Sequence, residues 1–155
     1  MAIRTIRTEG DEILKKKSKP VEVVDDKIKE LVRDMFETLK KYDGVGLAAV
    51  QVGILKQVVV IDLGEEGKQY VLINPEIIST SGTQTVEEGC LSFPNKFAKI
   101  ERPEKVKVRA IDEKGKVVEI SGKGLLAQAI CHELDHLEGE VFIDKIIPGT
   151  LEIVK

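Results

Sequence analysis

Two histidines lie four residues apart in the segment His132-Glu133-Leu134-Asp135-His136, and the chain has no other histidine. In an α-helix, residues i and i+4 project from the same face, so both imidazoles converge on one point with Glu133 beside them. This arrangement can hold a metal ion next to a general base; the alternative is two solvated or capping histidines that fell together by chance. A metal site constrains the fold strongly, because a third ligand has to reach this helix from elsewhere in the chain.

Candidates for that third ligand exist on both sides of the histidine segment. Only a short stretch follows His136, without histidine or cysteine, and its most distant acid is Glu152, which we expect in a frayed tail. Upstream, Cys90 follows Gly89, whose missing side chain lets the backbone approach a ligand closely. We take Cys90 as the third ligand; the alternative is a small buried hydrophobic residue.

The composition is that of an ordinary globular protein, and we expect a single domain over residues 1–155, with 42% hydrophobic and 33% charged residues. The net charge is −3 with both signs mixed, so neither nucleic-acid nor membrane binding is expected. The uncharged stretch 44–55 is too short to cross a bilayer, and the N-terminus lacks the apolar segment of a secretory signal. These features favour the cytoplasm.

Hydrophobic periodicity predicts two helices. Over residues 25–42 apolar side chains recur at i, i+3 and i+4 spacing behind two aspartates, and Gly44 closes the segment. A second helix is expected from about Gly124 to Glu138, ending at Gly139. It carries the histidines on or beside its buried face.

Four β-rich runs predict two hairpins. Residues 57–63 and 69–74 are joined by the glycine-containing turn 64–67, and the second run is expected to end at Pro75. Residues 105–110 alternate apolar and polar and turn through 113–115 into 116–120. Because the strands form hairpins, we expect an α+β fold: antiparallel β-hairpins and sheets packed around a C-terminal metal-binding helix, with an N-terminal amphipathic helix.

Three motifs occur in order along the chain: Gly44-Val45-Gly46-Leu47-Ala48-Ala49-Val50-Gln51, Glu88-Gly89-Cys90-Leu91-Ser92 and the histidine segment 132–136. Together they resemble the three signature motifs of the bacterial type of peptide deformylase, and the resemblance covers nearly the whole chain. It implies a metal held by Cys90, His132 and His136, with water in the fourth position. Fe(II) is the metal implied in the cell, and the donor set also suits zinc, nickel or cobalt.

The resemblance also implies the reaction. The metal lowers the pKa of its water, Glu133 takes the proton, and the formyl group of an N-formylmethionyl nascent peptide is hydrolysed to formate. The side-chain amide of Gln51 and the backbone N–H of Leu91 would stabilise the oxyanion.

Supporting residues are expected around these groups. Asp135 would orient an imidazole or bind a basic residue, or be a solvated acid, and Glu88 with Arg102 would form a buried pair that braces the Cys90 loop. The substrate-binding candidates are neighbours of motif residues: Val45, Gly46, Gly89, Leu125 and Ala129.

Three positions depart from the family pattern. Val50 stands where many relatives have proline; since proline would stiffen this loop, we expect Val50 to loosen the approach of Gln51 without abolishing it. Cys131 stands where many have glutamine and places a second thiol beside the site, open to oxidation or misligation, although it should not reach the metal. Phe97 replaces a polar residue near the substrate cleft and would alter peptide preference.

We therefore expect a metal-dependent peptide deformylase. Since the chain stops at Lys155 without the C-terminal helix that some relatives dock on the ribosome, we do not expect ribosome binding by that route, and at most a transient association. Two alternatives remain: a small HExxH metallopeptidase, which would need a downstream third ligand, and a degenerate homologue that binds formylated peptides without turnover.

Overall fold

The computed structural model describes residues 2–154, which form two α-helices, three short 3-10 helices and eight strands. The helical elements are η1 (Glu12–Lys15), α1 (Asp26–Lys41), η2 (Ala49–Val52), α2 (Leu125–Leu137) and η3 (Phe142–Lys145). The strands are β1 (Gly46–Ala48), β2 (Val58–Asp62), β3 (Gln69–Ser81), β4 (Gln84–Cys90), β5 (Phe93–Arg102), β6 (Lys105–Ile111), β7 (Val117–Lys123) and β8 (Glu152–Ile153).

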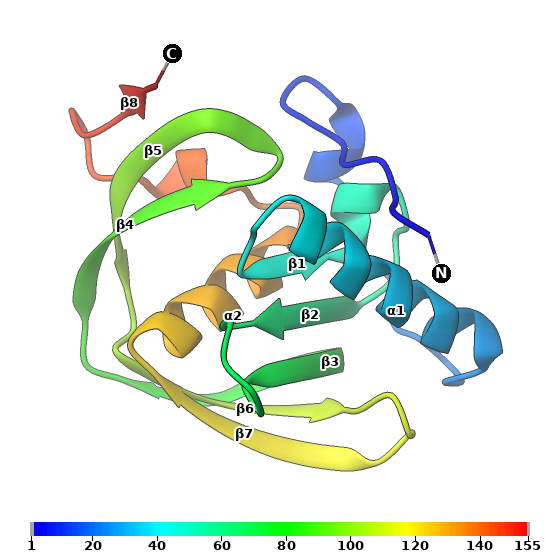
Figure 1. Cartoon of the computed structure of the whole chain (residues 1–155). Helices are drawn as coiled ribbons and strands as arrows, with labels where there is room; N and C mark the ends of the chain where they lie inside the picture. The colour runs from blue at the N-terminus through cyan, green and yellow to red at the C-terminus, as the bar shows by residue number, and fades with distance from the viewer. Residues whose placement is uncertain (1, 155) are drawn as a thin grey trace.

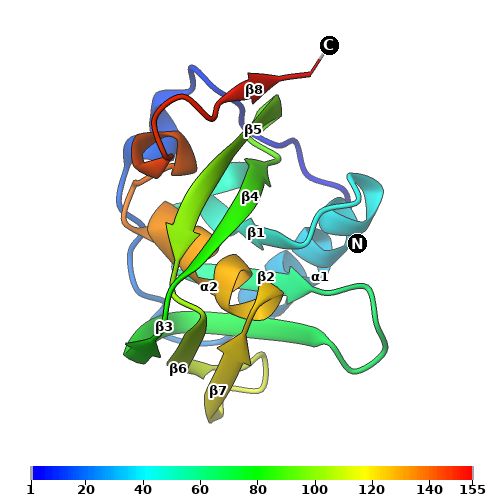
Figure 2. The ribbon, with the colours of Figure 1, turned by 90° about the vertical axis from the view of Figure 1, so that its left-hand side faces the viewer.

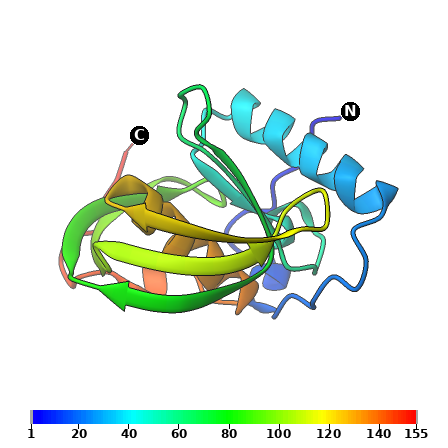
Figure 3. The ribbon, with the colours of Figure 1, turned by 90° about the horizontal axis from the view of Figure 1, so that it is seen from below.

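A five-stranded antiparallel sheet, in the order β1-β2-β3-β6-β7, separates the two long helices (Figure 1). Helix α1 packs on one face against β1 and β2, while α2 lies on the other face, inside the curve of the strands (Figure 3). Alternate side chains of β2 pack against the two helices. Its Val58 and Val60 pack toward α1, whereas Val59 and Ile61 pack toward α2. The α+β prediction is therefore confirmed.

Helix α1 begins and ends close to the predicted residues. Asp25 is its N-cap, and its side chain accepts a hydrogen bond from the backbone N–H of Ile28 at 3.0 Å. After the last helical residue, Asp43 adopts a left-handed backbone with φ 57° and the N–H of Gly44 donates to the Leu39 carbonyl at 3.0 Å. The left-handed residue is thus Asp43 and not the glycine.

A second sheet of three strands, in the order β4-β5-β8, stands against the open side of α2 (Figure 2). Neither β4 nor β5 was expected from the sequence, although together they carry the Cys90 motif. The tail expected to fray instead pairs with this sheet, since Glu152 lies opposite Phe97 and Ile153 opposite Lys96. The site is therefore built between two sheets that share no strand.

The expected end of a strand at Pro75 is wrong, because β3 continues to Ser81. The pairing of β3 with β6 shifts register between Ile73 and Glu76, and Asn74 has φ 52° at that place. Pro75 cannot donate a ladder hydrogen bond, and the irregularity accommodates it without ending the strand.

The N-terminal segment fastens the end of α2. The N–H of Ser18 donates to the Leu137 carbonyl at 2.9 Å, and Gly139, with φ 77°, lies so close to the Lys15 carbonyl that a Cβ would collide with it. Among the described residues, no helix has both the length and the apolar character that a membrane span requires.

Candidate metal and catalytic site

Helix α2 presents the predicted face to the interior. His132, Glu133 and His136 are all buried, and the two imidazole rings lie 5.0 Å apart, centroid to centroid, at an angle of 72°. Leu137 and Ile130 of the same helix pack into the core beneath the five-stranded sheet, which fixes the rotation of α2 about its axis.

The thiol of Cys90 reaches this face from the end of β4. The pairing of β4 with β5 is irregular between Gly89 and Cys90, and this bulge leaves the Sγ of Cys90 3.3 Å from the Nε2 of His136. The ligand atoms of Cys90, His132 and His136 all lie within 4.8 Å of one another. The structure therefore brings together the three side chains that the sequence singled out as ligands.

This donor set fits a divalent metal. Bond lengths of about 2.3 Å to sulfur and 2.0 Å to nitrogen in a tetrahedral site separate the two atoms by about 3.5 Å, close to the distance between Cys90 and His136. The Nδ1 of His132 is taken by the Glu88 carboxylate at 2.7 Å, so its Nε2 is the nitrogen available for a metal. Over residues 2–154, the buried atoms without a hydrogen-bond partner include His136 Nδ1 and Glu133 Oε1.

A buried chain of charges holds His132 in place. The Arg102 guanidinium donates twice to Glu88, through Nη2 at 2.6 Å and Nε at 3.1 Å, and its Nη1 donates to Asp135 at 2.7 Å. Asp135 also pairs with Lys145 at 3.1 Å. Of the two partners considered for Asp135, it binds a basic group, while Glu88 contacts the imidazole.

Burial and neighbouring charges shift the pKa of these groups. Burial alone would raise the pKa of Glu88, but hydrogen bonds from His132 and Arg102 outweigh it and lower the pKa to about 2. Burial lowers the pKa of His136 well below its ordinary value, so this imidazole is neutral and able to bind a metal. Burial also raises the pKa of Glu133 to about 7, which suits a group that takes up and returns a proton near neutrality.

The carboxylate of Glu133 rests directly against β1. A Cβ added to Gly46 would lie 2.6 Å from the Glu133 Oε2 and 2.9 Å from its Cγ. Only a glycine leaves room for the acid at this position. Gly46 therefore contributes to the site through the space that its missing side chain leaves for Glu133.

The side-chain amide of Gln51 is held at both ends. Its Oε1 accepts from the Ala48 N–H at 2.9 Å, and its Nε2 donates to the Ser92 hydroxyl at 3.0 Å and lies 3.5 Å from the Sγ of Cys90. The orientation of the amide is thereby fixed, with its donor toward the metal ligands. Val50 is fully buried in the core, and the looseness expected from it is not found at Gln51.

Comparison with known proteins places these residues in one family. The sequence profile of the polypeptide deformylase family matches residues 3–151. The chain belongs to the peptide deformylase family. It is 57% identical over 147 residues to a peptide deformylase of Alkaliphilus metalliredigens, which covers 95% of this chain and 99% of the relative.

Solved structures of deformylases share the fold. A peptide deformylase from Legionella pneumophila superposes with a TM-score of 0.91 at 46% identity, covering 94% of this chain and 87% of that one. The Synechococcus elongatus peptide deformylase, solved in complex with actinonin, gives a TM-score of 0.90 at 42% identity, covering 94% and 80% of the two chains.

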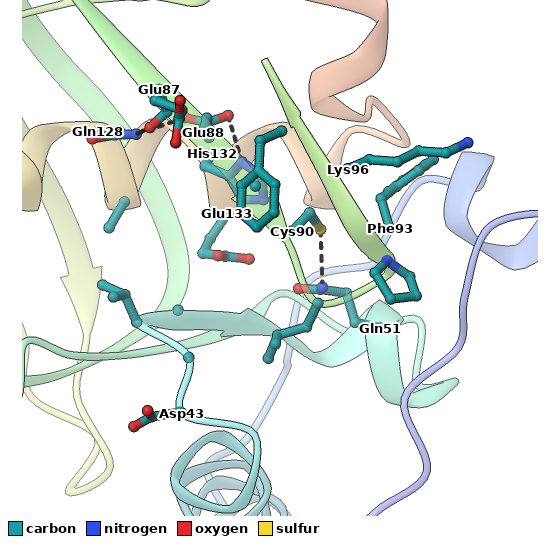
Figure 4. A pocket seen from close by; sticks show the side chains of 18 of the residues that line it. Asp43, Gln51, Glu87, Glu88, Cys90, Phe93, Lys96, Gln128, His132 and Glu133 are labelled. Atoms are coloured by element: carbon teal, nitrogen blue, oxygen red, sulfur yellow. Dashed lines mark hydrogen bonds and ion pairs between the residues drawn. The ribbon is translucent and has the colours of Figure 1, made fainter. Parts of the chain in front are cut away.

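A cavity of about 470 Å³ opens beside the ligands of this deformylase site (Figure 4). All five substrate-binding candidates line it: Val45, Gly46, Gly89, Leu125 and Ala129. Gln51, Leu91 and Glu133 also reach it, whereas His136 lies deeper and is not among the lining residues.

The sequence reasoning missed part of the cavity wall. Asp43, Glu87, Phe93, Asn95, Lys96 and Gln128 line it as well. Most of them belong to β4 or β5. They could have been found only if the sequence had predicted the hairpin that these two strands form. Phe97 lines the cavity with 37% of its surface exposed, and its ring lies against Gly89, where an added Cβ would come within 2.8 Å of ring carbons.

Cys131 is not at the site. It is buried in the apolar core between α2 and the five-stranded sheet, and this burial raises the pKa of its thiol. A buried neutral thiol is a poor target for oxidation and a poor metal ligand. The expectation that Cys131 is reactive is therefore wrong.

Proposed function

We propose that this chain removes the formyl group from the N-terminal methionine of newly made polypeptides, with Glu133 as proton carrier and Gln51 and Leu91 as oxyanion donors. The family to which it belongs performs this metal-dependent hydrolysis, in which formate and a free amine are the products. The observation that carries the roles is that the Cys90 thiol meets the two histidines on either side of Glu133 in the helix, with the Gln51 amide 3.5 Å from its Sγ.

Each step uses a group that faces the cavity. In its deprotonated form Glu133 takes a proton from the attacking water, and it later delivers this proton to the departing amine. As the formyl oxygen gains negative charge, the Nε2 of Gln51 and the N–H of Leu91 donate to it. One hydrogen of the Gln51 amide stays on the Ser92 hydroxyl at 3.0 Å, and the other, which now lies toward the Cys90 Sγ at 3.5 Å, is the one that would donate to the oxyanion.

Cys90, His132 and His136 would hold the metal. A divalent ion bound there supplies positive charge that acidifies water and polarises the formyl oxygen. We assign Fe(II) as the ion in the cell; zinc, nickel and cobalt accept the same sulfur and nitrogen donors. Because Glu88 fixes one nitrogen of His132 and carries Arg102 behind it, the ligand is oriented before any ion arrives.

The cellular setting follows from the substrate. Formylated N-termini occur on nascent chains, so we place the protein in the cytoplasm with transient access to the ribosome.

The half-exposed apolar residues Val45 and Leu125 at the cavity wall suit a methionine side chain.

Formate release from a formyl-Met peptide tests the proposal directly. Protein loaded anaerobically with Fe(II), or separately with Ni(II) or Zn(II), should release formate and expose a free amine. Glu133→Ala should abolish turnover and keep the metal, and Cys90→Ala should lose the metal. Cys131→Ala is the matched control and should lose neither.

The other outcomes separate the alternatives. No formate with any metal, together with retained binding of the peptide, would identify a non-catalytic binder. Cleavage of internal peptide bonds without formate release would identify a peptidase. Full activity of Glu133→Ala would exclude it as the base.

A further inference from the structure

The backbone of the N-terminal segment joins the two parts of the chain that carry the oxyanion donors. The N–H of Arg7 donates to the carbonyl of Gln51 at 2.6 Å, and the N–H of Glu9 donates to the carbonyl of Ser92 at 2.8 Å. Figure 1 shows this dark-blue segment running past η2 toward the turn between β4 and β5. We call residues 7–9 the N-terminal brace.

The two parts joined by the brace belong to different sheets. Gln51 follows β1 of the five-stranded sheet, whereas Leu91 lies in the turn between β4 and β5 of the three-stranded sheet. Since these sheets share no strand, no β-ladder sets the distance between the Gln51 amide and the Leu91 N–H. The bond from Gln51 Nε2 to Ser92 Oγ crosses the gap, but it uses the same nitrogen that serves the oxyanion. The brace crosses the gap with backbone groups alone.

Side chains anchor the brace at both ends. The Arg7 guanidinium lies over Gly53, where an added Cβ would be 3.0 Å from its Nη2, and it pairs with Asp11 at 3.0 Å. At the other end, both carboxylate oxygens of Glu9 accept from the Lys96 ammonium at 2.6 Å. Figure 4 shows Lys96 extending from β5 along the cavity wall toward the N-terminal segment. Each end is thus attached by one backbone and one side-chain contact.

We propose that the N-terminal brace is a positioning element that sets the separation between the Gln51 amide and the Leu91 N–H. The inference rests on the proposed function, because it takes these two groups as the oxyanion donors. Arg7 and Glu9 touch neither substrate nor metal ligand. They act through two backbone carbonyls. The first belongs to Gln51, which is itself a donor, and the second belongs to Ser92, which directly follows the donor Leu91.

Because the brace lies on the surface, substitutions in it should change the position of the oxyanion donors without unfolding the protein. Arg7 and Glu9 are exposed, and exposed ion pairs contribute about 0 to 1 kcal/mol to folding. Their replacement therefore leaves the protein folded. Displacement of an oxyanion donor, by contrast, weakens a hydrogen bond that stabilises the transition state more than the bound substrate. We therefore expect kcat to fall and KM not to rise.

The test compares variants of the metal-loaded protein. The double variant Arg7→Ala/Glu9→Ala removes both side-chain anchors and keeps both backbone donors. Arg7→Pro and Glu9→Pro each remove one donor. The matched control is Lys15→Ala/Lys16→Ala, which removes two exposed charges from the same N-terminal region outside the brace.

We expect kcat to fall about three- to tenfold in the double alanine variant and at least about tenfold in each proline variant, with KM within about twofold. The control should match the wild type. A folded double alanine variant with wild-type kcat would overturn the proposal even if the proline variants fail to fold. A rise in KM at constant kcat would also overturn it, because that pattern indicates damage to the cavity wall through Lys96.

A second readout does not depend on turnover. In the zinc-loaded protein, the side-chain ¹⁵NH₂ resonances of Gln51 can be identified by their loss in Gln51→Glu. They should shift in the brace variants and stay in place in the control. If the wild type releases no formate, the proposed function fails, and this measurement still decides whether the brace orients Gln51; unshifted resonances would mean that it does not.

Discussion

Replacement of Gly46 by alanine isolates the placement of Glu133 from the other properties of the site. The new Cβ would stand 2.6 Å from the Glu133 Oε2, whereas ordinary contacts begin near 3.4 Å, so the carboxylate must retreat by roughly 0.8 Å. Misplacement of a reacting group by about 1 Å can cost on the order of 100-fold in rate. We therefore expect kcat to fall about 10- to 100-fold. Overpacking against the buried Glu133 should cost about 1–3 kcal/mol of folding free energy.

Gly122→Ala is the matched control for this substitution. It adds the same methyl group to a strand glycine, and its Cβ would stand 2.8 Å from the Leu126 Cγ, away from the catalytic groups. Urea unfolding should show similar losses of stability for both variants, while steady-state formate release should show a loss of kcat for Gly46→Ala alone. Equal kcat values for the two variants would refute the argument that Gly46 makes room for the base.

Three further predictions concern the charges and the metal. Arg102→Met removes the guanidinium that pairs with Glu88 and Asp135, so the buried Glu88 charge keeps only His132, and urea unfolding should show a loss of about 3–5 kcal/mol. Burial alone would raise the pKa of Asp34, but a hydrogen bond from the Ala2 N–H and contacts with Arg4 outweigh it and lower the pKa. The ionised Asp34 therefore stabilises the fold above about pH 4, and this stabilisation is lost as the pH falls through the lowered pKa. Melting curves should show Asp34→Asn below wild type at pH 7 and level with it near pH 2. Zinc at about 1,000 times its Kd should stabilise the wild type by about 4 kcal/mol and leave Cys90→Ala unchanged.

The sequence predicted those elements whose local signals agree with their tertiary role. Helix α1 combines a capping aspartate with regular apolar spacing, and β6 and β7 alternate cleanly, so their bounds were close. Strands β4 and β5 were missed because Glu88 and Gly89 are poor strand formers and Pro94 and Asn95 resemble a turn. These strands are held by pairing with each other and with β8, which no local pattern reports.

The candidate site divides in the same way. Helical spacing was enough to place His132, Glu133 and His136 on one face, since the geometry is local. The partner of Asp135 could not be chosen from spacing, because the choice depends on Arg102, which comes from β5. The N-terminal contacts with Gln51 and Ser92 gave no sequence signal at all, because backbone N–H groups make them.

The attachment of the N-terminal segment to the end of α2 has a consequence for the order of folding. Lys15 packs against Gly139, Cys90 meets His136 across 46 positions, and Lys96 meets Glu9 across 87. Contacts between distant residues close long loops, which slows folding because chain entropy is lost before the contacts form. During synthesis, the N-terminal residues must remain without these partners until α2 has been made. Each new molecule therefore completes its hydrolytic centre only after α2 has been made, and folding rates should be slow for a chain of this size.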